Sequence, residues 1–197
     1  MKILLTTIVL LYSGVNVMAD SFDQIKADLS RSGCQRIEFI NILESDVFET
    51  VDTTYGELLI SSTNSYRLTI GESIFLADSA FTYDYSTETN QVIIEKRELG
   101  NFDEISFITR LDELYRTQTI APDLKYYLKK RPDVTADTPD SMTVTIDKKA
   151  LNLKQIDYLD VNEDLNRVII LKQEYLEKCP DRAFEPDFPA DAERVKL

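Results

Sequence analysis

Segments in which apolar or aromatic residues alternate with polar ones recur along most of the sequence and limit the folds open to it. In FTYDYS, the aromatic residues Phe81, Tyr83 and Tyr85 occupy every second position, and the β-branched run VIIE follows the polar stretch STETNQ. Successive side chains of a strand point to opposite faces, so this pattern predicts a β-hairpin with one aromatic face. What this aromatic face covers is the first question that the sequence raises.

Comparable segments run from residue 34 to residue 96 and resume between residues 124 and 176. Their period of two, and the turn-forming residues between them, are typical of antiparallel sheets. We therefore expect a mainly β (α+β) fold in which about ten or eleven strands follow one another in a long meander.

Two segments interrupt this pattern with helical spacing. Residues 21–32 place Phe22, Ile25 and Leu29 three and four positions apart and end before Gly33. Residues 101–117 predict a second helix, inserted in the middle of the sheet, whose apolar positions include Phe102, Ile105, Phe107, Ile108 and Leu111. The strands carry more apolar residues than two helices can be expected to cover. Two interpretations follow: an ordinary β-sandwich core with a packed helix, or a curved sheet that holds an apolar cavity under a helical lid.

The first nineteen residues, MKILLTTIVLLYSGVNVMA, contain one charge, Lys2, then an apolar run, and then Val17 and Ala19 at the usual spacing for signal cleavage. This pattern is typical of a secretory signal peptide, because the apolar run is too short for a membrane span. Residue 20 is Asp, so the lipid anchor of a lipoprotein signal is not indicated. We expect residues 20–197 to form a single exported domain.

The formal net charge of the chain is −13. A surface of that sign repels nucleic-acid phosphates and anionic lipid headgroups, so we expect neither nucleic-acid binding nor stable membrane insertion, but a freely diffusing protein. We expect this protein to be a monomer. The sequence contains two cysteines, Cys34 and Cys179. In an oxidising compartment an even number favours a disulfide, here between the two ends of the domain, and two buried free thiols are the alternative.

The sequence contains no histidine, which excludes a Ser-His-Asp hydrolase, a Cys-His protease and a zinc site with histidine ligands. GESIF at residues 71–75 lacks the second glycine of a nucleophile elbow, and DVNEDLN at residues 160–166 has Leu165 where a calcium loop needs glycine. We expect no catalytic residue, metal or cofactor. A hydrolase that uses a pair of carboxylates is the enzymatic alternative.

The order of the segments gives a further indication. A Gly-x-Leu-x-Ile motif at Gly56–Ile60 is followed by SYRL at 65–68, FLAD at 75–78, FTYDY at 81–85, NQV at 90–92, the helical segment and a late FEPDFPADAERV. Together with the exported N-terminus, this order resembles the LolA family, the periplasmic carriers that move lipoproteins from the inner to the outer membrane of Gram-negative bacteria. The resemblance runs over nearly all of residues 20–197.

The resemblance implies an incomplete antiparallel β-barrel whose concave face is covered by helices, and a cavity that takes up the acyl chains of lipoproteins. The cavity residues that it implies are Leu58, Ile60, Tyr66 and Leu68, with Phe81, Tyr83 and Tyr85 lining the cavity or packing beneath it. The lid residues that it implies are Phe102, Ile105, Phe107, Ile108 and Leu111. Members of the family carry a basic residue after Gly-x-Leu-x-Ile that helps to latch the lid. This chain has Ser61 and Ser62 there, and Arg67 is a candidate replacement.

The function that the resemblance implies is a periplasmic carrier without enzymatic activity. Its partners would be outer-membrane-directed lipoproteins as cargo, an inner-membrane ABC-type lipoprotein exporter and an outer-membrane receptor. A periplasmic sensor of lipids or lipopeptides on the same scaffold is the main alternative. A purely structural exported module is a further one.

Overall fold

The computed structural model describes residues 21–29, 33–97, 110–121, 124–135, 138–147 and 149–197. The predicted signal peptide, residues 1–19, and the predicted lid residues Phe102, Ile105, Phe107 and Ile108 lie outside the described residues. Within them the elements are α1 (Ser21–Leu29), β1 (Cys34–Ser45), β2 (Thr50–Ser61), β3 (Tyr66–Ile70), β4 (Ser73–Ala77), β5 (Phe81–Ser86), β6 (Gln91–Lys96), α3 (Leu111–Leu114), β7 (Tyr115–Ala121), β8 (Lys125–Lys130), β9 (Ser141–Asp147), β10 (Asn152–Leu159), β11 (Leu165–Leu176) and β12 (Glu193–Lys196).

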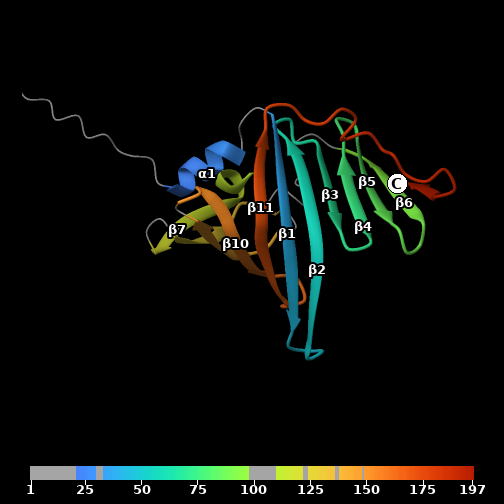
Figure 1. Ribbon diagram of the computed structural model, residues 1–197. Coiled ribbons are helices and arrows are strands. Elements are labelled where there is room, and N and C mark those ends of the chain that lie inside the picture. Colours follow the sequence, from blue (N-terminus) through green and yellow to red (C-terminus); the bar gives the residue numbers. More distant parts are fainter. Residues whose placement is uncertain (1–20, 30–32, 98–109, 122–123, 136–137, 148) are drawn as a thin grey trace, which may run out of the picture.

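These strands form one sheet of twelve strands in the order β12-β6-β5-β4-β3-β2-β1-β11-β10-β9-β8-β7. Neighbouring strands are antiparallel, except that β12 runs parallel to β6. β7 and β12 occupy the two ends of this order and do not pair with each other, so the sheet is not closed. Figure 1 shows the strands on either side of β1 and β2 turning away from them. The expected incomplete antiparallel barrel is therefore the observed fold, with twelve strands where about ten or eleven were predicted.

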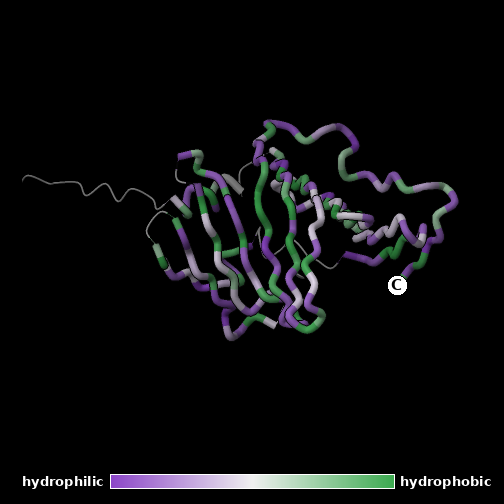
Figure 2. The backbone as a smooth tube through the Cα atoms, turned by 60° about the horizontal axis from the view of Figure 1, so that its bottom comes forward, coloured by the Kyte–Doolittle hydropathy of each residue, from purple (hydrophilic) through white to green (hydrophobic). Residues whose placement is uncertain are grey.

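The two faces of the sheet follow from the register, because residues directly opposite in an antiparallel pair have their side chains on the same face. We call the face on which α1 and α3 pack the inner face and the opposite one the outer face. Apolar residues alternate with polar ones along the strands, as the hydropathy colouring of Figure 2 shows. On β8 to β10 the inner face carries Tyr126, Val144 and Ile156, which lie opposite one another across the strands.

Two buried clusters share the inner face. The first contains residues from α1, α3 and β7 to β10: Phe22, Ile25, Leu111, Leu114, Tyr115, Tyr126, Leu128, Met142, Val144, Ile146, Leu153 and Ile156. The second contains residues from β1 to β4: Ile37, Phe39, Leu58, Ile60, Tyr66 and Ala77. Val168 and Ile170 of β11 pack against both clusters. The inner face is therefore one continuous apolar surface from β8 to β4.

The apolar side of the sheet changes between β4 and β5. In β4, SIFLA, both faces are apolar: Phe75 and Ala77 belong to the inner face, whereas Ile74 and Leu76 belong to the outer face. On β5, Tyr83 and Tyr85 lie opposite Leu76 and Ile74, so they are on the outer face. The polar residues Thr82, Asp84 and Ser86 take the inner face instead.

The predicted helix at residues 101–117 is wrong in its last part. α3 ends at Leu114, and Tyr115 begins the strand β7, which pairs with β8 from Tyr115 opposite Lys130 onward. The helical spacing of Leu111, Leu114 and Tyr115 did place all three in one buried cluster. Tyr115 reaches this cluster from an edge strand, because pairing with β8 overrides the local helical preference.

Candidate functional site: the apolar inner face

The residues that the Gly-x-Leu-x-Ile motif and the following strand place together do lie together. Leu58 and Ile60 of β2 stand opposite Leu68 and Tyr66 of β3 and share the inner face with them. Leu58, Ile60 and Tyr66 are buried, and Leu68 is partly buried against the same cluster. Their assignment to an acyl-chain cavity stays a prediction, whereas their common face is a property of the structure.

The structure explains why the first residue of the motif, Gly56, is a glycine, which the sequence analysis did not predict. A Cβ atom built on Gly56 would lie 2.3 Å from Cζ of Phe39, which is its cross-strand partner on β1. The Phe39 ring therefore crosses the backbone of β2 at the one position without a side chain. A lone glycine inside an alternating strand is the signal that could have indicated such a close approach.

Phe81, Tyr83 and Tyr85 are separated from the other predicted cavity residues by the thickness of the sheet. They are on the outer face, where the ring centroids of Tyr83 and Tyr85 lie 5.8 and 5.2 Å from that of Phe188. Tyr85 and Val92 form a small buried cluster with Ala192, and Phe188 packs against it, whereas Phe81 is 42% exposed. The aromatic face of the β5–β6 hairpin thus covers the C-terminal segment.

Tyr83 is held in place by Asp78. Its hydroxyl donates a hydrogen bond to Oδ2 of Asp78 at 3.0 Å, while Oδ1 of the same carboxylate accepts from the backbone N–H groups of Ala80 and Phe81. Partial burial and the nearby carboxylate raise the pKa of Tyr83 to about 12. Asp78 therefore fixes both the β4–β5 turn and the first aromatic contact of the C-terminal segment.

Leu111 is the one predicted lid residue within the described part of the chain. It is buried on α3 and packs with Leu114, Phe22 and Ile25 over the strands of the first cluster. An ion pair ties the two helices together: Nζ of Lys26 on α1 lies 2.8 Å from Oδ1 of Asp112 on α3. α1 and α3 are thus connected to each other and cover the β7–β10 half of the inner face.

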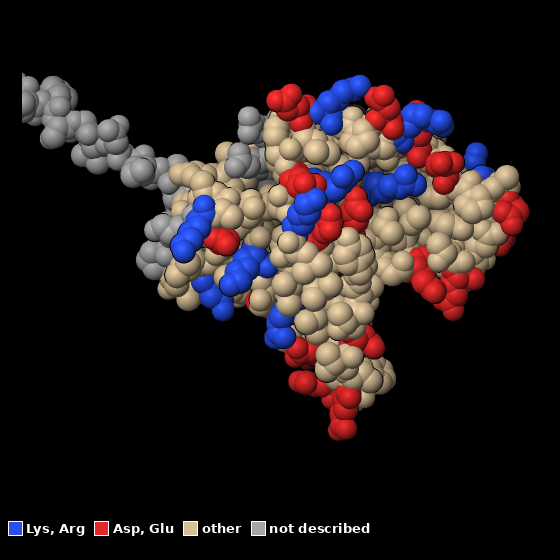
Figure 3. Space-filling view, in the orientation of Figure 1, with Lys and Arg blue, Asp and Glu red and all other residues tan. Residues whose placement is uncertain are grey.

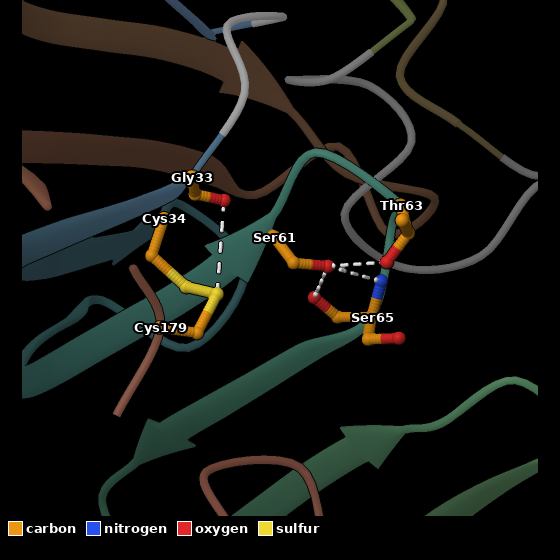
Figure 4. Close-up of a disulfide and its surroundings, with 6 residues drawn as sticks. All are labelled: Gly33, Cys34, Ser61, Thr63, Ser65 and Cys179. Atoms are coloured by element: carbon orange, nitrogen blue, oxygen red, sulfur yellow. Dashed lines mark hydrogen bonds between the residues drawn. A yellow bond between two sulfur atoms is a disulfide. The ribbon is translucent and has the colours of Figure 1, made fainter. Parts of the chain in front are cut away.

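Ser61 and Arg67 lie on the same face of the sheet as Leu59, which is the outer face. Ser61 Oγ accepts a hydrogen bond from the Ser65 backbone N–H at 3.0 Å and lies 2.9 Å from Thr63 Oγ1, so it closes the β2–β3 turn (Figure 4). Arg67 lies opposite Leu59 and Leu76, and is therefore on the outer face. The suggestion that Arg67 replaces the family's basic residue is wrong, because its side chain starts from the opposite side of the sheet.

Cys34 and Cys179 form a disulfide, with their Cα atoms 5.0 Å apart. It joins the first residue of β1 to the segment that follows β11, beside Gly33 (Figure 4). The sulfur of Cys179 lies 3.6 Å from the Gly33 carbonyl oxygen, a contact without a hydrogen bond because a disulfide sulfur carries no hydrogen. The disulfide at one end and the β12–β6 pairing at the other hold the C-terminal segment against the sheet.

A pocket of about 450 Å³ adjoins the first cluster at Tyr158. Its other lining residues include the polar Lys130, Thr138, Asp160 and Glu163 and the apolar Leu159 and Val161. Burial raises the pKa of Tyr158, with the Asp160 carboxylate as a second cause. A volume of this order is typical of small-ligand pockets. The apolar inner face therefore ends, at this side, in a recess lined by both polar and apolar residues.

Among the described residues no group of three or more Asp, Glu and Cys side chains is placed to hold a metal ion. Asp160, one of the positions considered for calcium, uses Oδ1 to accept from the N–H groups of Asn162 and Asp164 in the β10–β11 turn. In the described parts of the chain, no helix is both long enough and apolar enough to span a membrane.

No protein-family model matches the sequence, and no curated protein matches it either. Several solved structures have a similar fold. An uncharacterized conserved protein from Thermus thermophilus is 12% identical with a TM-score of 0.55, over 90% of this chain and 99% of that one. At this identity the likeness concerns the fold alone.

Two further similar structures have lower TM-scores. A LolA superfamily protein from Nitrosomonas europaea is 12% identical with a TM-score of 0.46, over 86% of this chain and 99% of that one. A DUF1329 family protein from Desulfovibrio piger is 11% identical with a TM-score of 0.48, over 84% and 96% of the two chains. The structures similar to this one thus include a member of the family that the sequence resembles.

Proposed function

We propose that the protein is a periplasmic carrier that binds the acyl chains of lipoproteins on its inner face and moves them from the inner to the outer membrane. The observation that carries this proposal is the continuous apolar inner face from β8 to β4. A β-sandwich would cover such a face with a second sheet, but the described residues form a single sheet, with short helices on one half of its inner face.

The energetics favour a cover that opens. Removing an acyl chain from water contributes about 0.8 kcal/mol per methylene, so a chain of about fifteen methylenes contributes about 12 kcal/mol when fully buried. Release would then be very slow. A carrier needs partial burial and a cover that can be displaced at small cost. α1 and α3 are short, and they contribute Phe22, Ile25, Leu111 and Leu114 to the first cluster. A bound acyl chain would replace the apolar contacts of these side chains when the helices are displaced.

The recess at Tyr158, which has polar as well as apolar lining residues, supports this arrangement. A lipoprotein joins its acyl chains to a polar head and a polypeptide. A binding site therefore needs an apolar surface next to a solvent-accessible surface with polar groups. Tyr158 packs against the first cluster and also lines the recess. We place the acyl chains along the inner face and their polar attachment at this recess.

In the proposed cycle an inner-membrane ABC-type exporter supplies the cargo and an outer-membrane receptor accepts it. The carrier performs no chemistry, and the free energy for loading is supplied by the exporter. A lipid sensor on the same scaffold would bind a similar ligand but would not pass it on. Transfer of cargo therefore separates the two functions.

The test uses the purified mature chain, residues 20–197, with spheroplasts or inner-membrane vesicles that retain outer-membrane-directed lipoproteins and a matched exporter. We expect a soluble complex close to one lipoprotein per carrier, and its transfer to outer membranes. The variant Leu68→Gln, on the inner face, should lose the complex, whereas Leu171→Gln, at an exposed residue in the β-bulge of β11, should keep it. Absence of any soluble complex would contradict the proposal, and a bound lipid without transfer would favour the sensor.

A further inference from the structure

The β1–β2 hairpin extends beyond its neighbours on one side of the sheet. β2 begins at Thr50, but its pairing with β3 starts only at Gly56, where Gly56 lies opposite Ile70. Thr50–Thr54 therefore have β1 on one side and, within the described residues, no strand on the other. Figure 1 shows this hairpin projecting from the body of the molecule. An unpaired strand edge of this kind can pair with another strand.

The tip of this hairpin combines exposed apolar side chains with acidic ones. Val47, Phe48 and Val51 are 76%, 75% and 67% exposed. Asp46 and Glu49, both exposed, lie in the same turn, and within the described residues neither forms an ion pair. Figure 3 shows acidic side chains gathered on this projection. We call residues 46–52 the acidic tip.

The opposite kind of surface lies at the β7 end of the sheet. β7 is the last strand in the order, so its outer edge has no strand beside it among the described residues. Arg116 lies directly opposite Lys129, and Lys125 is on the same face of β8. All three are exposed, and none forms an ion pair in the part of the chain that the structure describes. We call these residues of β7 and β8 the basic edge.

The basic edge costs stability in the isolated molecule and carries apolar groups of its own. Like charges directly opposite each other across two strands are destabilising, so the Arg116–Lys129 pair favours an acidic partner. Ile120 and Leu124, at the end of the same hairpin, are 55% and 51% exposed. The basic edge and the acidic tip are thus opposite in charge, and each offers exposed apolar side chains and an unpaired strand edge.

We propose that the acidic tip of one copy of this chain docks on the basic edge of a second copy, where Thr50–Thr54 of β2 extend the sheet beside β7. Such a contact joins two different surfaces, so each copy can bind two others and the complexes grow with concentration. This inference is independent of the proposed carrier function and differs from the expectation of a monomer.

A second copy fits better than a membrane surface. Exposed apolar groups at a membrane-binding tip are normally accompanied by basic residues, because cytoplasmic and many other membrane surfaces carry anionic headgroups. Here the accompanying residues are Asp46, Glu49 and Asp52. The net charge of −13 opposes self-association at long range. The separation of acidic and basic residues to different parts of the surface provides a local attraction within the Debye length.

The test is sedimentation velocity of the mature chain over a range of concentrations, with two charge-reversal variants. The tip variant is Asp46→Lys with Glu49→Lys, and the edge variant is Lys125→Glu with Lys129→Glu. The control, Glu72→Lys with Glu88→Lys, makes the same change in net charge as the tip variant at exposed positions in two other turns. We expect the wild type and the control to associate, and each charge-reversal variant alone to bind at least about tenfold more weakly.

Mixing the tip variant with the edge variant gives the decisive result. The reversed tip is then complementary to the reversed edge, and the unchanged edge of one variant is complementary to the unchanged tip of the other. Association should therefore return in the mixture, which a general effect on folding or net charge would not produce. The proposal is overturned if the wild type stays monomeric, if both variants associate like the wild type, if mixing restores nothing, or if Phe48 mediates binding to zwitterionic vesicles instead.

Discussion

The contact between Gly56 and Phe39 predicts that the substitution Gly56→Ala destabilises the protein. In the middle of a strand, replacing glycine by alanine normally stabilises a protein by about 0.5–1 kcal/mol, because the unfolded chain loses conformational freedom. At Gly56 the added methyl group would lie 2.3, 2.7 and 2.8 Å from Cζ, Cε2 and Cε1 of the Phe39 ring. The ring would have to leave a position in which Phe39 is 8% exposed and packed in the second cluster.

The expected cost follows from the geometry. Crowding of this kind in a packed core destabilises by about 1–3 kcal/mol, which outweighs the gain from the unfolded state. We therefore expect Gly56→Ala to lower the free energy of unfolding by about 1–2 kcal/mol. Urea unfolding followed by far-ultraviolet circular dichroism measures this, and the midpoint should fall while the slope m stays constant.

A matched background identifies the cause. The three ring atoms close to the new methyl group are absent from leucine, so Gly56→Ala introduced into Phe39→Leu should be neutral or stabilising. The coupling energy between the two positions should then be about 2 kcal/mol. A Gly56→Ala variant that is as stable as the wild type, or an equal loss on both backgrounds, would refute the contact as the reason for this glycine.

Two further predictions concern the C-terminal segment. Replacing Cys34 and Cys179 by serine opens a loop with a sequence separation of 145 residues and should lower the free energy of unfolding by about 5 kcal/mol in the chain-entropy model. A loss below about 1 kcal/mol in urea unfolding would contradict a disulfide in the native protein. Tyr83 should ionise near pH 12 in the folded protein, since its pKa is raised to about 12 by burial and by Asp78. Because the unfolded chain releases this proton near pH 10, the contribution of Tyr83 to stability should be complete below about pH 10 and disappear as the pH rises toward 12. Ultraviolet difference titration should show a lower pKa for Tyr83 in Asp78→Asn, and an unchanged curve would refute the assigned hydrogen bond.

Much of the sheet could be predicted from period-two patterns, because a strand with one buried face has apolar residues at every second position. The common face of Leu58, Ile60, Tyr66 and Leu68 is instead an expectation from the family resemblance, and the register shows that the four residues share one face. The helical spacing of Phe22 and Ile25 correctly predicts an N-terminal helix with these residues on its buried side, since both are buried on α1.

The change of face at β4 could not be predicted from alternation. In SIFLA, apolar residues occupy both faces, so the pattern carries no information about which side the next strand buries. Alternation therefore leaves open whether the aromatic stripe of β5 lines the cavity or packs beneath it, and the register places it on the face opposite to that of Leu58. Phe188, which packs against Tyr85 of this stripe, lies about a hundred residues further along the chain in a Pro-rich segment without periodicity. The strand β12 could not be predicted for the same reason.

The central claim, that acyl chains bind on the inner face, is tested most directly by photocrosslinking. A fatty acid with a terminal diazirine is bound to the mature chain, irradiated, and its attachment sites are mapped by mass spectrometry of peptides. The account predicts labels on inner-face residues of β2 to β4 such as Leu58, Tyr66 and Leu68. Labels confined to outer-face residues such as Tyr55, or no saturable labelling at all, would contradict it.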